Sequence, residues 1–91
     1  MWLSIPKHSK MINLDLYSSV HIITVNAGNG LYELSAYESN SNFAESLISP
    51  CSLAHAKNQF SNILHCLSRG AVVCRVYDED ETSASNDENT T

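Results

Sequence analysis

Cys51 and His55 are the residues of this 91-residue chain whose types and spacing come nearest to a reaction centre. They are four positions apart at the start of an expected helix, so their side chains can share one helix face. A thiol near a helix N-terminus and beside an imidazole can act as a nucleophile or supply half of a metal site. The next candidates on the same helix, His65 and Cys66, are ~15 Å further along its axis, which is too far to share one ion.

Only His8, His21 or Cys74 could complete a metal site around this pair, by folding over from elsewhere in the chain. The sequence contains no Ser-His-Asp order, phosphate loop or paired catalytic carboxylates. We therefore expect no catalytic residue, no bound metal and no cofactor, and the chain is not expected to be an enzyme. A thiol- or metal-dependent enzyme that uses Cys and His is kept as a distant alternative.

The net negative charge of the chain is concentrated at its C-terminal end. Residues 78–91 carry a charge of −6 and residues 1–77 a charge of +1, which together give the −5 of the whole chain. A flexible polyanion can engage a basic groove of a partner or compete with nucleic acid for it. The simpler interpretation is a disordered tail that only improves solubility. The partner-binding candidates in this segment are Asp78, Glu79, Asp80 and Glu81.

Residues 52–69 have the periodicity of an amphipathic helix. Pro50 precedes this segment, Ser52 can cap it, and Gly70 is expected to end it directly after Arg69. Its apolar stripe is expected to pack on a sheet and consists of Leu53, Ala56, Phe60, Ile63, Leu64 and Leu67.

The opposite face of this helix is expected to point away from the sheet, and it is polar with almost no acid. Amide and imidazole groups recognise partners through hydrogen bonds without long-range charge. A merely solvated face that uses the same residue types is an equal alternative. The partner-binding candidates on this face are His55, Asn58, Asn62, His65 and Arg69.

Four segments have the pattern of strands. Apolar residues alternate along 11–17, β-branched residues dominate 20–26, and 31–38 returns after the Asn-Gly turn at 27–30. A final β-branched strand is expected at 71–77.

Two further segments are less regular. Residues 43–48 can form a short helical turn, because Asn42 and Glu45 have the spacing of a capping box, or else an extended edge segment. Residues 1–10 are expected to be a loose leader, because Ile5-Pro6 breaks regular structure.

Together these segments predict a small α+β fold in the order β-β-β-α-β, a mostly antiparallel sheet with one amphipathic helix packed on it. The domain is expected to span residues 11–77, between the leader at 1–10 and the acidic disordered tail at 78–91. Tyr32 and Tyr37 point to opposite faces of their strand, so at least one is expected on the open sheet face as an anchor for a partner. Cross-strand packing within the hairpin is the alternative.

Composition limits the classes of function. Three cysteines without CxxC spacing, no signal-peptide pattern and no apolar stretch of membrane-span length indicate a soluble, reduced, cytoplasmic protein without membrane contact. Few bases argue against direct binding of nucleic acid. The expected partner is a larger intracellular protein or ribonucleoprotein complex, and a homodimer stays open because a single core of this size is marginal.

No family motif is matched residue by residue. In layout alone, a short β-β-β-α-β chain without catalytic groups is similar to small phage-encoded inhibitors, including some anti-CRISPR proteins, and to bacterial accessory and antitoxin-like domains. This resemblance implies a viral or mobile-element protein acting in the host cytoplasm. The hypothesis from the sequence is a non-catalytic protein-binding module that inhibits a nucleic-acid-handling complex. The alternative is a structural accessory subunit or homodimeric adaptor.

Overall fold

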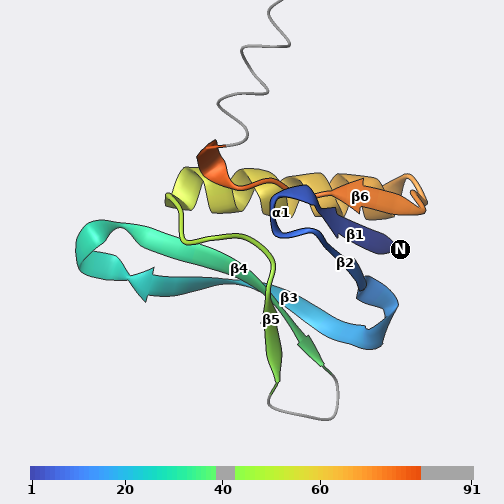
Figure 1. Ribbon diagram of the computed structural model, residues 1–91, viewed down its shortest axis with the longest axis horizontal. Coiled ribbons are helices and arrows are strands. Elements are labelled where there is room, and N and C mark those ends of the chain that lie inside the picture. Colours follow the sequence, from blue (N-terminus) through green and yellow to red (C-terminus); the bar gives the residue numbers. More distant parts are fainter. Residues whose placement is uncertain (39–42, 81–91) are drawn as a thin grey trace, which may run out of the picture.

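A computed structural model of the chain describes residues 1–38 and 43–80, and within these ranges it shows a small α+β fold (Figure 1). The predicted α+β class is confirmed. The strands are β1 (Trp2–Ile5), β2 (Lys10–Asn13), β3 (Tyr17–Asn26), β4 (Leu31–Glu38), β5 (Ala44–Ser46) and β6 (Val73–Arg75), and the helix is α1 (Leu53–Ser68). Short 3-10 turns occupy Pro6–His8, Leu14–Leu16 and Ala27–Asn29.

The strands form two three-stranded sheets. Sheet A has the order β2-β1-β6, with β1 antiparallel to β2 and parallel to β6. Sheet B has the order β3-β4-β5 and is antiparallel throughout. Helix α1 contacts both sheets, through β6 and through β4 and β3, and Figure 1 shows it alongside β6 with the long β3–β4 hairpin beneath.

The predicted hairpin forms as expected, with Val20 opposite Ala36 and Ile22 opposite Leu34. Its turn depends on Gly30, whose φ of 64° lies in the left-handed region that glycine adopts without steric cost. The hairpin is the longest paired segment among the described residues, and α1 contacts both of its strands.

The helix also begins and ends where the sequence indicates. The hydroxyl of Ser52 accepts a hydrogen bond from the His55 N–H at 3.2 Å, which caps the first turn. Gly70 follows the last turn with φ 69°, and its N–H donates to the Leu67 carbonyl at 3.1 Å.

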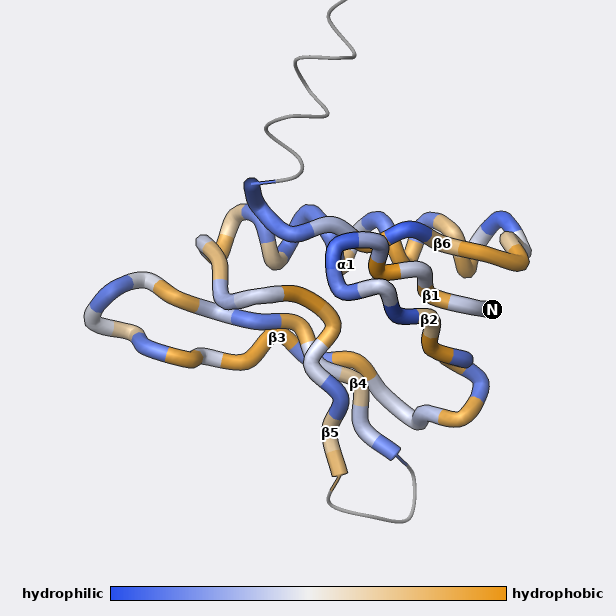
Figure 2. The backbone as a smooth tube through the Cα atoms, in the orientation of Figure 1, coloured by the Kyte–Doolittle hydropathy of each residue, from blue (hydrophilic) through white to orange (hydrophobic). Residues whose placement is uncertain are grey.

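The core lies between α1 and the two sheets. Leu3 and Ile5 from β1, Leu34 from β4 and Val76 after β6 are among its fully buried side chains. Leu47 and Ile48, in the segment that leads into α1, are buried with them. Figure 2 shows apolar stretches on the strands, and apolar and polar residues alternate along α1.

The expectation of a loose leader at residues 1–10 is wrong. Trp2–Ile5 is the central strand of sheet A, where Leu3 pairs with both Ile12 and Cys74. Burial of the Leu3 and Ile5 side chains holds the segment in place, and Pro6 ends the strand without preventing it.

The strand predicted at 11–17 is shorter than expected. The chain turns at Leu14–Leu16 because the Asn13 side chain accepts a hydrogen bond from the Asp15 N–H at 3.1 Å, a local bond that competes with strand pairing. For residues 43–48 the extended alternative is correct, since Ala44–Ser46 pairs with β4 as β5.

Candidate functional site

Helix α1 packs on the body with a different face from the one predicted. Its buried residues are His55, Ala56, Gln59, Ile63 and Cys66. Phe60 was expected to mark the direction of the core, but its side chain is 37% exposed, and Leu64 is 59% exposed. The helix is therefore rotated, so that part of its polar face is buried and part of its apolar stripe is open.

The physical reason is that the chain after β6 needs hydrogen-bond partners. The imidazole Nε2 of His55 lies 2.7 Å from the Tyr77 carbonyl oxygen. Because a carbonyl only accepts, that nitrogen carries the proton. One turn later, Gln59 Oε1 accepts from the Tyr77 N–H at 3.0 Å. These two side chains satisfy both backbone groups of one residue, as a neighbouring strand would.

Asn62 continues this row toward β6. Its side-chain amide donates to the Arg75 carbonyl at 2.7 Å. His55 and Asn62, which were predicted to face a partner, are thus occupied within the fold, and burial of polar side chains is tolerated because they are hydrogen-bonded. Of the helical candidates, Asn58, His65 and Arg69 are exposed.

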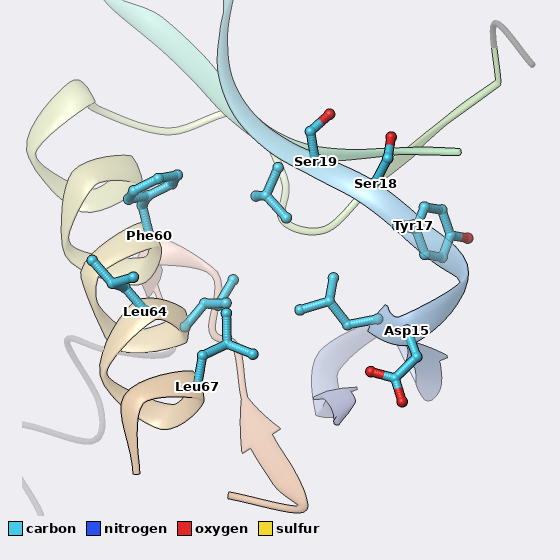
Figure 3. Close-up of a pocket in the computed structure, with 10 residues that line it drawn as sticks. Asp15, Tyr17, Ser18, Ser19, Phe60, Leu64 and Leu67 are labelled. Carbon is cyan, nitrogen blue, oxygen red and sulfur yellow. The ribbon is translucent and has the colours of Figure 1, made fainter. Parts of the chain in front are cut away.

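The open part of the apolar stripe forms one wall of a groove, shown in Figure 3. In Figure 3, Leu67 points from α1 across the groove, Phe60 and Leu64 lie above it on the helix, and Tyr17 lies on β3 at the opposite side. The cavity has a volume of about 390 Å³. We call it the α1–β3 groove, and its apolar lining consists of Leu14, Tyr17, Val20, Phe60, Ile63, Leu64 and Leu67.

The remaining lining of the α1–β3 groove is weakly polar. Ser18 and Ser19 point their hydroxyls away from the helix, and Asp15 is the one charged residue that lines the groove in the described chain. The lining comes from the turn before β3, from β3 itself and from α1, and no residue of β4 or β5 takes part. The groove therefore opens at the β3 side of sheet B, and it suits apolar side chains of another protein segment.

The acidic residues that follow β6 are not detached from the body. Asp78 is only 2% exposed, and its carboxylate accepts hydrogen bonds from the Ser49 N–H at 2.9 Å and the Ser49 hydroxyl at 2.8 Å. His8 Nε2 lies 3.2 Å from the same carboxylate, and Lys7 lies 3.9 Å away. The predicted start of a free tail at residue 78 is therefore wrong, because this carboxylate joins three segments of the fold.

The pKa of Asp78 reflects these contacts. Burial alone would raise it, but the two hydrogen bonds from Ser49 and the nearby His8 and Lys7 outweigh burial, and the pKa is lowered from 3.8. The carboxylate is consequently ionised at neutral pH in spite of its burial.

The next two acids also contact the body, and we call Asp78, Glu79 and Asp80 the acidic strap. Glu79 accepts from the Ser52 N–H at 3.1 Å and from its hydroxyl at 2.7 Å, and these hydrogen bonds lower the pKa of the Glu79 carboxyl. A carboxylate at this place also complements the dipole of α1. Asp80 pairs with Lys7. Glu81, the last acidic candidate, and the rest of the predicted tail lie outside the described residues.

The thiol–imidazole pair at the start of α1 is not arranged as a nucleophile. Cys51 is buried, and its N–H and carbonyl bond to Tyr32 at 2.8 Å each. Burial, with Glu79 and Asp78 nearby, raises the pKa of the Cys51 thiol to about 11, so the reactive thiolate is scarce at neutral pH. Burial and the neighbouring Cys66 raise the pKa of Cys74 to about 12. The described residues contain no group of three His, Cys, Asp or Glu that could hold a metal ion.

The two tyrosine candidates are half-buried. Tyr32 packs against the core beside its backbone bridge to Cys51. Tyr37 makes an edge-on ring contact with His21 on β3, with centroids 5.1 Å apart. The structure brings neither tyrosine to the α1–β3 groove.

Sequence reasoning missed the groove because it assigned the whole apolar stripe to the core. The apolar stripe covers two rows of helix positions. Ala56 and Ile63 form the buried row, whereas Phe60, Leu64 and Leu67 form a neighbouring row that is exposed. Gln59 lies beside Phe60 and is buried, but the sequence gives no signal that its amide oxygen accepts from the Tyr77 N–H.

The chain was compared with protein-family models, curated proteins and solved structures, and none of them matches it. Among the residues that the structure describes, no helix is long and apolar enough to cross a membrane.

Proposed function

We propose that the chain is a non-catalytic protein-binding module whose contact surface is the α1–β3 groove. The observation that carries this proposal is the exposure of Phe60, Leu64 and Leu67 in a concave apolar site, although the chain has a core available for such residues. Exposed apolar side chains grouped in one place are typical of protein contact sites. The protonated, buried thiol of Cys51 supports a non-catalytic role.

The chemistry of the groove favours a protein ligand over nucleic acid. No Lys or Arg lines it, whereas phosphate recognition needs clustered bases. The partner is then an apolar segment or face of an intracellular protein, met in the cytoplasm. Both an inhibitor and an accessory subunit could act through such a contact.

The inhibitor form of the proposal, directed at a nucleic-acid-handling complex, depends on the acidic end of the chain. Because the acidic strap contacts Ser49, Ser52 and Lys7, the part of this charge that would reach a basic channel begins after Asp80. A test of the polyanion should therefore remove residues 81–91 and keep 78–80, so that the contacts of Asp78 are preserved.

The proposal is tested by affinity capture of the tagged full chain from its own cells, with quantitative mass spectrometry. Leu64→Asp places a charge in the groove, and Val72→Asp is the matched control, because Val72 is 74% exposed and does not line the groove. We expect Leu64→Asp to reduce recovery of the specific partner about tenfold or more, since a buried unpaired charge at a contact centre is costly. Val72→Asp should recover the partner like the wild type.

Equal recovery by all three chains would contradict the assignment of the groove. A parallel capture with residues 1–80 separates the two forms of the proposal. Loss of a nucleic-acid-handling complex from this shortened chain, with the groove intact, would support the polyanion-assisted inhibitor. Unchanged recovery would leave the groove as the contact site and argue against a role for residues 81–91.

A further inference from the structure

The outer edge of β3 lies beside the α1–β3 groove and has no strand paired to it within the described chain, because β3 is the first strand in the order β3-β4-β5. The strand is ten residues long, Tyr17–Asn26, and contains neither a charged residue nor proline. Natural edge strands are commonly protected from pairing by a lysine, a proline or shortness. β3 has none of these three protections, and the irregularities in its pairing with β4 lie at its two ends, between Tyr17 and Ser19 and between Thr24 and Asn26, so that Ser19–Thr24 remains a regular edge.

The edge and the groove form one continuous surface. Tyr17, Ser18, Ser19 and Val20 belong to β3 and also line the groove, while Phe60, Leu64 and Leu67 form its other wall. A strand added to the edge of β3 would therefore extend sheet B beneath the open wall of α1. Main-chain hydrogen bonds would come from the edge and apolar burial from the groove, which is the usual division in strand addition.

We propose that the occupant of this surface is a second copy of the chain, paired antiparallel through β3 and its symmetry mate. This inference rests on the proposed function, since it names the partner of the same surface. A two-fold axis perpendicular to sheet B would join the two three-stranded sheets into one of six strands. It would also keep both helices on the same side, with their grooves facing each other across the joint.

Charge is the reason to choose a second copy. In a two-fold contact each residue near the axis meets itself, so a charged strand would oppose like charges. The β3 sequence YSSVHIITVN avoids this, and Asp15 is the one charged residue lining the groove. Residues 1–80, which include the acidic strap, hold five bases and seven acids, and this net charge of −2 adds only modest repulsion between two bodies.

Burial supports the same choice. On α1 only Ala56 and Ile63 of the predicted stripe are buried, and Leu67 is 50% exposed. In the dimer, the exposed apolar side chains of α1 (Phe60, Leu64 and Leu67) would lie over the paired β3 strands and contact those of the second copy. A core that is small in one chain would thus be completed by two, as expected for a domain of this size.

The test is sedimentation of the full wild-type chain over a concentration series, beside Leu64→Asp and Val72→Asp. We expect a monomer–dimer equilibrium for the wild type, at least a tenfold increase in the dimer Kd for Leu64→Asp, and an unchanged Kd for Val72→Asp. Circular dichroism of the wild type and both variants checks that the fold is retained, as expected because both substituted side chains are exposed.

Hydrogen exchange then tests the strand pairing itself. Amides in residues 17–26 should exchange more slowly as protein concentration rises, while those in β6, at an edge of sheet A, should not change. A dimer that protects β6 instead of β3, or that Val72→Asp weakens and Leu64→Asp does not, would overturn the inference.

A wild-type chain that remains monomeric at all concentrations would also overturn it. The proposed function would survive that result if Leu64→Asp still abolished capture of a different protein. If the chain is monomeric and capture is indifferent to Leu64→Asp, both proposals fail.

Discussion

Asp78 is a carboxylate that would be costly to bury without partners. Its oxygens are satisfied by Ser49 and by His8, so the charge contributes to stability instead of opposing it. Lys7 lies near Asp78 and also pairs with Asp80, two residues later, whose side chain is 68% exposed. The two aspartates therefore provide a comparison between a buried and an exposed carboxylate in one segment.

We expect Asp78→Asn to lower the free energy of unfolding by about 1.5–3 kcal/mol at neutral pH, because hydrogen bonds to a buried charged acceptor are replaced by weaker ones. Urea denaturation followed by circular dichroism measures this. Asp80→Asn is the control and should change stability by less than about 1 kcal/mol, since exposed ion pairs contribute little. Equal effects of the two substitutions would contradict the burial of Asp78.

The same substitution has a defined pH dependence. The pKa of Asp78 is lower in the folded chain than its ordinary value of 3.8, so the folded state prefers the ionised form. The stability that the wild type gains over Asp78→Asn is therefore complete above pH 3.8 and is lost as the pH falls through the lower folded-state pKa. Facing the carboxylate are the ammonium group of Lys7 and the imidazole of His8. A difference that grows on acidification would contradict this sign.

At the scale of residues, the sequence shows which residues are acidic but not which of them contact the folded body. A run of carboxylates has the composition of a tail, and nothing in it shows that Ser49 and Ser52 lie within hydrogen-bond distance. Those serines are 29 and 27 residues away from their acceptors. Composition predicts that a run of acidic residues is solvated on average, and it cannot indicate which acid of the run is buried.

Helix α1 is the element whose orientation determines where a partner can bind. It holds β6 and the segment after it through His55, Gln59 and Asn62, and it thereby leaves Phe60 and Leu64 on the wall of the α1–β3 groove. If this orientation is correct, two asparagines one turn apart should differ in their importance for stability.

We expect Asn62→Ala to destabilise the fold by about 1–2 kcal/mol, because the Arg75 carbonyl loses its donor. Asn58→Ala is the matched control on the exposed face of the same helix and should stay within about 0.5 kcal/mol of the wild type. Thermal unfolding of both variants measures the difference. The orientation first predicted from the sequence, with both asparagines solvated, would give two small and similar effects.

At the scale of elements, prediction was most successful where the signal was local. Ser52 and Gly70 mark the ends of α1, and the Asn-Gly turn marks the hairpin. The rotation of α1 depends on which distant backbone groups need partners, and periodicity contains no information about them. The α1–β3 groove was missed for that reason.

At the scale of the whole molecule, the acidic strap holds together parts of the chain that are remote in sequence. Through Asp78, Glu79 and Asp80 the end of the described chain contacts the turn at Lys7, the segment at Ser49 and the start of α1. Chains that end before and after the strap should therefore differ in stability.

We expect residues 1–77 to be less stable than residues 1–80 by at least about 2 kcal/mol, which corresponds to a Tm lower by roughly 10 °C or more for a domain of this size. Differential scanning calorimetry of the two shortened chains measures this. Similar Tm values for both would show that the strap contributes nothing to the fold.

The pairing of β1 with β6 is the part of the fold that lay furthest beyond the sequence. Each strand is short, three or four residues, and neither has a strong pattern by itself. Their pairing is decided by the joint burial of Leu3 and Cys74, residues from opposite ends of the domain. Ile5-Pro6 does not make this segment irregular and only marks the end of β1.

This parallel pairing also sets an order of events during synthesis. At the usual rate of about 5–20 residues per second, β1 leaves the ribosome roughly 4–14 s before β6. During that interval β1 can pair with β2, but its other edge is unpaired and the side chains of Leu3 and Ile5 lack part of their cover. Sheet A is thus completed only after β6 has emerged, and the nascent chain is most exposed to chaperones and to misassociation before that point.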